Sequence, residues 1–243
     1  MGNDRPQSRP RPRQGLPRAN PPSRGGVVDI VDRIVVALAA VILCAAATLG
    51  RAEPAPDDFF IYVGNDRVDE VKKMLASGVD PDAVDKNGEP AIVLAARGGN
   101  TKTLDVLLAT KVNVNAHNSF GDSAIMAAAI GGRLDLVKKL RARGADVNQK
   151  GWTALIYAAT GGHDAIVTYL LGEGADINAK SPNGTTALMM AVRQNKPSTV
   201  DLLIARGADV NLRNDAGASA LDWAKRGVDK TIVEHLRKAG AKD

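Results

Sequence analysis

A short glycine-led segment returns five times along the chain at a nearly constant spacing. It reads GADVN at residues 144–148 and 207–211 and GADIN at 174–178, and looser copies begin at Gly78 and Lys111. Successive copies begin 33, 33, 30 and 33 residues apart. A second motif keeps the same phase: a tripeptide of Thr, Ser or Pro, then Ala, then Leu or Ile, which begins two residues after a glycine. Two motifs that share one period predict an array of stacked structural units.

Within each period the residues predict two short helices joined by tight turns. In residues 181–213, Thr186 can cap the first helix by accepting from a free backbone N–H. Pro197 suits the first turn of the second helix, and Gly207 can end that helix in the left-handed conformation. Apolar residues recur between these signals at helical spacing. One such unit cannot bury its apolar face alone, whereas stacked neighbours can.

This pattern resembles the ankyrin repeat over residues 57–243. The resemblance implies an all-α repeat solenoid, in which each helix-turn-helix unit carries a β-hairpin finger. We expect six units, of which the first caps the array and begins at Asp57 and Asp58. The units are 57–84, 85–117, 118–150, 151–180, 181–213 and 214–243.

Three features depart from the family's pattern. The histidine that usually follows the tripeptide is absent from every copy. The step from the third to the fourth unit is three residues short, so we expect a truncated finger with Trp152 at its edge. Lys111 stands where a glycine usually ends a helix, and a left-handed lysine would cost roughly 1–2 kcal/mol. We therefore expect a looser second unit.

The positive charge of the chain lies ahead of the repeats. The formal net charge is +5, from 32 basic and 27 acidic residues. Eight of the basic residues and three of the acidic ones precede residue 53, so 24 of each remain in the repeats. A neutral repeat array argues against nucleic-acid binding, which depends on cations that contact phosphates.

An export signal is predicted between the basic head and the repeats. Residues 34–49 are uncharged and mostly apolar, and they follow a Pro- and Arg-rich head, residues 1–33, that we expect to be disordered. This order predicts a secretory signal peptide, with cleavage after Ala52 or within 45–47. The array with this leader is similar to exported, periplasmic ankyrin proteins of Gram-negative bacteria. We therefore predict a periplasmic repeat domain.

An uncleaved signal anchor is the alternative. Residues 34–49 are short for a bilayer span, which needs about 20 apolar residues. Retained as an anchor in the inner membrane, they would still leave the repeats on the periplasmic side, because the positive-inside rule keeps the basic head in the cytoplasm.

The repeats contain no motif for catalysis. The single cysteine, Cys44, excludes a disulfide framework and a cysteine-based zinc site. Phosphate-binding loops and nucleophile elbows are absent. We expect His163 to be structural and His117 and His235 to be solvated or packed, because a metal site needs several converging ligands. The sequence therefore predicts a protein without enzymatic activity, cofactor or metal.

The resemblance implies that a monomeric array binds a protein partner on a concave face, formed by the fingers and the first, inner helices. Among the variable positions there, Phe120 and Trp152 have the character of interface anchors. Alternatively, Trp152 folds down to fill the gap beside the short finger. Tyr157, Met190 and Trp223 lie one position deeper and are expected to pack between repeats. The candidate partner-binding residues are Lys86, Asn87, Glu89, Arg97, Phe120, Asp122, Ile130, Trp152, Thr160, Asn183, Thr185, Arg193, Gln194, Asp215 and Arg226.

Overall fold

The computed structural model describes residues 56–227 and 230–242, which belong to one compact unit, Pro54–Asp243. The predicted head, signal segment and cleavage sites lie outside the described residues. In the described part, twelve helices form six successive pairs. The first helices of the pairs are α2 (Pro56–Gly64), α4 (Ala91–Gly98), α6 (Ala124–Ile130), α8 (Ala154–Gly161), α10 (Ala187–Arg193) and α12 (Ala220–Arg226). The second helices are α3 (Val68–Ala76), α5 (Thr101–Leu108), α7 (Leu134–Ala142), α9 (Asp164–Gly172), α11 (Pro197–Ala205) and α13 (Lys230–Lys238).

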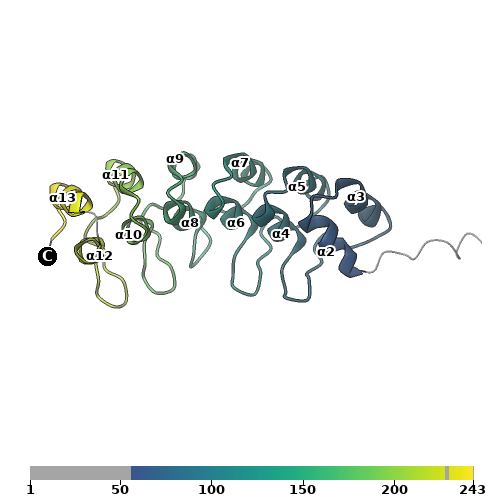
Figure 1. Ribbon diagram of the computed structural model, residues 1–243, viewed down its shortest axis with the longest axis horizontal. Helices are drawn as coiled ribbons and strands as arrows, with labels where there is room; N and C mark the ends of the chain where they lie inside the picture. The colour runs from purple at the N-terminus through teal and green to yellow at the C-terminus, as the bar shows by residue number, and fades with distance from the viewer. Residues whose placement is uncertain (1–55, 228–229, 243) are drawn as a thin grey trace, which may run out of the picture. The chain divides into compact units, whose positions relative to one another are not determined.

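The first helices form one row and the second helices another (Figure 1). Each first helix contacts the first helices before and after it, as α6 does with α4 and α8. The loops that precede α4, α6, α8, α10 and α12 extend away from the row as fingers (Figure 1). The first helices are rich in buried alanine, for example Ala127, Ala128 and Ala129 in α6, and these small side chains allow close approach. The core is therefore one continuous layer between the repeats.

The helix ends follow the sequence signals. The Thr186 side chain accepts a hydrogen bond from the backbone N–H of Met189, and Pro197 occupies the first turn of α11. Gly207 has a φ of 89°, the left-handed conformation that a helix end requires here. These predictions are confirmed. Asp57 lies within the first turn of α2, which begins one residue earlier than expected.

The fingers are short hairpins. In the described residues, single antiparallel bridges close three of them, and they pair Val84 with Pro90, His117 with Ser123, and Arg213 with Ser219. The finger before α10 is closed by a hydrogen bond from Ser181 N–H to the carbonyl of Thr185 (2.9 Å).

Lys111 does not adopt the left-handed conformation that the family's pattern suggested. The described non-glycine residues with positive φ are Asp66 and Asn195. Helix α5 ends at Leu108, and the Thr110 hydroxyl donates to the carbonyl of Leu107 (2.6 Å). The backbone N–H of Thr110 donates to the same carbonyl (3.0 Å), so the helix end is closed without a left-handed residue at Lys111.

The last residue of the GADVN motif joins its repeat to the next one. Asn148 Oδ1 accepts the backbone N–H of Asp176 (2.8 Å), and its Nδ2 donates to the carbonyl of Gly174 (2.9 Å). The amide thus holds two points of the following motif. Asn115 and Asn211 make both of these bonds to their next repeats, and Asn178 and Asp82 make the acceptor bond. The recurrence of this residue therefore reflects connection between units as well as turn capping.

We predict that Asn148→Ala lowers the free energy of unfolding by about 1 kcal/mol, because two backbone groups lose their partner at a solvent-accessible site. Asn148→Asp should cost less, since a carboxylate keeps the acceptor bond, as Asp82 does with the N–H of Asn113 (2.7 Å). Urea unfolding of the two variants and the wild type measures both effects. Unchanged stability in Asn148→Ala would contradict the connecting role.

Candidate protein-binding face

Most of the predicted partner-binding residues lie on one surface, made by the fingers and the C-terminal ends of the first helices. We call this surface the finger face. Of the predicted residues, Lys86, Asn87, Arg97, Phe120, Ile130, Asn183, Arg193, Gln194, Asp215 and Arg226 are exposed, and Glu89, Asp122, Trp152 and Thr160 are partly buried. Thr185 does not lie at the surface as predicted. Only 1% of it is exposed, and its backbone N–H donates to the Ser181 hydroxyl within the finger. Its side chain is therefore not available to a partner.

Four of the predicted residues come together around a hollow of about 190 Å³. Phe120 forms part of its lining and is 84% exposed, the most exposed large apolar side chain in the described chain. Ile130, at the end of α6, also lines the hollow and is 38% exposed. The complete lining is Arg97, Phe120, Asp122, Met126, Ala127, Ile130 and Tyr157. A hollow with this mixture of apolar and polar groups suits a side chain of a protein partner.

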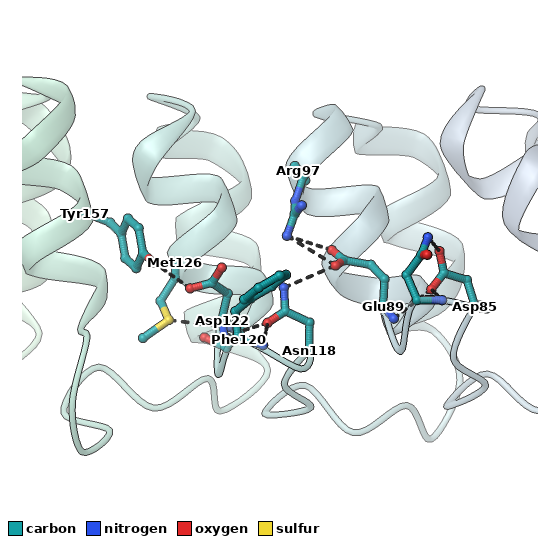
Figure 2. A network of polar contacts seen from close by, with 10 residues as sticks. Asp85, Glu89, Arg97, Asn118, Phe120, Asp122, Met126 and Tyr157 are labelled. Carbon is teal, nitrogen blue, oxygen red and sulfur yellow. Dashed lines mark hydrogen bonds and ion pairs between the residues drawn. The ribbon is translucent and has the colours of Figure 1, made fainter. Parts of the chain in front are cut away.

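The finger that carries Phe120 is held by buried polar contacts (Figure 2). Asn118 is 7% exposed, and its Oδ1 accepts the N–H groups of Phe120 (3.0 Å) and Asp122 (2.9 Å). Its Nδ2 donates to Glu89 Oε2 (3.1 Å) in the preceding finger. Glu89 in turn lies 2.9 Å from the guanidinium of Arg97. The Phe120 ring is therefore presented from a fixed backbone, which reduces the entropy lost on binding.

Tyr157 extends this network from the next repeat. Its hydroxyl donates to Asp122 Oδ1 (2.6 Å), so α8 is bonded to the finger before α6 (Figure 2). Burial, and next the hydrogen bond to Asp122, raise the pKa of Tyr157 above the usual range of tyrosine. The sequence predicted that Tyr157 packs between repeats, which is correct, but gave no indication of this bond.

Trp152 fills space beside the short finger. It is partly buried against the core, and its ring centroid lies 5.9 Å from that of Tyr157 at an interplanar angle of 43°. Of the two interpretations of Trp152, the structure favours the gap-filling one. Phe120 is therefore the aromatic residue of the finger face with the greatest exposure.

A second hollow, of about 360 Å³, lies at the ends of α10 and α12. It is lined by Val192, Arg193, Trp223, Arg226 and Gly227. The guanidinium carbon of Arg193 lies 5.8 Å from the centroid of the Trp223 ring, within the range of a cation–π contact. Met190, which the sequence placed in the same layer as Trp223, is 8% exposed and belongs to the core.

The histidines have structural partners. His163 Nε2 lies 3.0 Å from the carbonyl of Ile130 and links α9 to the end of α6, which confirms its predicted role. His117 contacts the side chain of Gln149, and His235 contacts that of Asp201. Within residues 56–227 and 230–242, no group of three or more potential metal-binding side chains comes together.

Comparison with known proteins gives the family. A sequence model of ankyrin repeats in three copies matches residues 59–150, 111–181, 143–214 and 173–242. The chain belongs to the ankyrin-repeat family. No curated protein matches it in a sequence search. As an ankyrin array, it is similar to a solved ankyrin repeat domain from Acinetobacter baumannii AYE, with 30% identity and a TM-score of 0.67, over 76% of this chain and 98% of that one. The ankyrin repeat domain of human ASB11 is similar in fold, with 22% identity and a TM-score of 0.69, over 76% and 84% of the two chains.

The raised pKa of Tyr157 predicts a pH effect on this ankyrin array. The folded protein keeps the Tyr157 proton where the unfolded chain releases it, so the stabilisation is complete below pH of about 10 and is lost above it. The free energy of unfolding of the wild type should therefore fall more steeply above this pH than that of Tyr157→Phe. Urea unfolding at several alkaline pH values measures the difference. Equal slopes would show that Tyr157 does not hold its proton in the folded state.

Proposed function

We propose that this ankyrin array is a non-catalytic module of the periplasm that binds a partner protein on its finger face. The observation that carries the proposal is the 84% exposure of Phe120 beside a hollow lined by both apolar and polar side chains, on a finger fixed by Asn118. An exposed aromatic ring costs little to order on binding and supplies a large contact area, which makes it a typical interface anchor. We further propose that the partner is an exported enzyme or toxin, which the array stabilises or inhibits.

The arrangement of the face supports binding of an extended surface rather than of a small molecule. The exposed candidate residues recur in successive units, from Lys86 in the second to Arg226 in the last. The two hollows on this face are open to solvent, and different repeats line them. A protein partner can contact several repeats at once, whereas a small ligand needs one enclosed pocket.

The proposed location depends on the leader. An apolar segment at 34–49 after a basic head supports export across a membrane. In the part of the chain that the structure describes, no helix has the length and hydropathy of a membrane span. The alternative proposal is a membrane-tethered scaffold, in which residues 34–49 are retained as an anchor.

We predict that Phe120→Ala combined with Ile130→Ala removes the partner from pull-downs. Phe120 and Ile130 are both exposed, so the double variant should remain folded. For Phe120→Ala alone, the free energy of unfolding should change by no more than about 0.5 kcal/mol. Ile61→Ala is the matched control, because Ile61 is an exposed apolar residue (56%) of α2 outside the hollow. Tagged wild type and variants are compared by quantitative mass spectrometry of captured proteins. Identical profiles for the double variant and the wild type would reject the Phe120 hollow as the contact.

The leader prediction is tested by the mass of the native protein. We expect the mature chain to begin at Glu53, in the soluble periplasmic fraction. Intact-mass spectrometry of the protein purified from its own cells identifies the first residue. A chain that begins near Met1 and sediments with membranes would contradict cleavage and support the tethered alternative.

A further inference from the structure

We infer that the hollow at the ends of α10 and α12 binds an acidic side chain of the partner protein, and that an apolar side chain lies next to this acidic residue in the partner. This inference deepens the proposed function, because it assigns a chemistry to one part of the partner. It rests on two arginines, Arg193 and Arg226, that line the hollow with Val192 and Trp223.

Comparison of equivalent arginines in three repeats shows which of them lack an acidic partner in their own repeat. Arg97, Arg193 and Arg226 occupy the same position in three units, the end of the first helix. Eight residues before Arg97 lies Glu89, whose carboxylate is 2.9 Å from the guanidinium of Arg97. The corresponding residues in the other two units are Thr185 and Ala218, which carry no charge. The acidic residue that pairs with the arginine is therefore present in the second repeat, and an uncharged residue replaces it in the fifth and sixth.

Arg193 and Arg226 are both exposed, and neither has an acidic partner among the described residues. Arg193 lies over the ring of Trp223, a contact that orients the guanidinium and leaves its N–H groups unused. The nearest acid along α12, Asp222, is already engaged by Arg213 (3.0 Å) and Ser219. Two arginines on adjacent repeats thus offer donors that match the geometry of a carboxylate.

Favourable interaction with the helix dipole does not account for this arrangement. The helix dipole stabilises a cation at a helix C-terminus, and that stabilisation requires only that the charge lie near the helix end. It requires neither the contact of Arg193 with Trp223 on the next repeat nor the sharing of one hollow by both arginines.

An acidic protein segment fits the hollow better than a polyanion does. Val192 is 6% exposed and Trp223 is partly buried, so part of the lining is apolar. The repeats carry equal numbers of acidic and basic residues, so they lack the excess positive charge that favours nucleic-acid binding. The chain's own head is not a suitable occupant, because residues 1–33 contain seven arginines and three acids.

The two tryptophans of the chain make the test specific. Trp223 lies in the proposed site and Trp152 lies beside the Phe120 hollow, so their indole N–H signals report the two regions separately. The probe is a short peptide of alternating Glu and Leu, added to the isotope-labelled protein and followed by two-dimensional NMR. We expect the Trp223 signal to shift with the Glu peptide, with little change at Trp152 or with a Gln-and-Leu peptide. The shift should weaken with added salt.

Arg193→Gln combined with Arg226→Gln should lower the affinity for the Glu peptide by about tenfold or more, because charge-assisted hydrogen bonds are lost. Arg206→Gln is the control, since Arg206 is an exposed arginine at the end of α11. Equal shifts with both peptides, no shift at Trp223, or unchanged affinity in the double variant would overturn the inference. None of these results bears on partner capture through Phe120, so the proposed function is judged separately.

Discussion

Contact between neighbouring repeats is the constraint on which the rest of this protein depends. The helices of the described residues are seven to nine residues long, too short for stability in isolation. Helix α8 is stable because Leu155 and Ile156 are buried between the rows. The Asn148 amide, bonded to the next motif, fixes the spacing of that stack. Each repeat is thus completed by the repeats beside it, as in other solenoids.

The same constraint leaves a few positions of each unit free for recognition. Two positions of each repeat lie at the finger face. The first is the seventh residue of the first helix and the second is the residue eight places before it. Contacts between repeats do not determine which side chains these positions carry. Along the array the first of these positions is Arg97, Ile130, Thr160, Arg193 and Arg226, and the second is Glu89, Asp122, Trp152, Thr185 and Ala218. The face therefore carries an ion pair in the second repeat, large apolar side chains beside polar ones in the third and fourth, and, among the described residues, unpaired arginines in the last two. A partner that matches this order of charge and hydrophobicity would be bound in one direction only.

Local signals made the period, the helix pairs and the caps at Thr186, Pro197 and Gly207 predictable, because each depends on residues within one unit. The sequence also placed Phe120 correctly at the surface. It did not predict the bond from Tyr157 to Asp122 or the bond from Asn118 to Glu89, since these join different units and depend on how the repeats stack.

The conformation of two turns also differed from the sequence-based expectation, because hydrogen bonds within each turn determine it. Thr185 was expected at the surface but is buried, and the turn before Lys111 closes through the backbone and hydroxyl of Thr110 without a left-handed residue.

Hydrogen exchange of the array with and without its captured partner tests the account most directly. We predict added protection in the finger at residues 118–122 and at the ends of α6, α10 and α12. Protection confined to α5, α7, α9 and α11 would place the partner on the opposite row of helices and contradict the account.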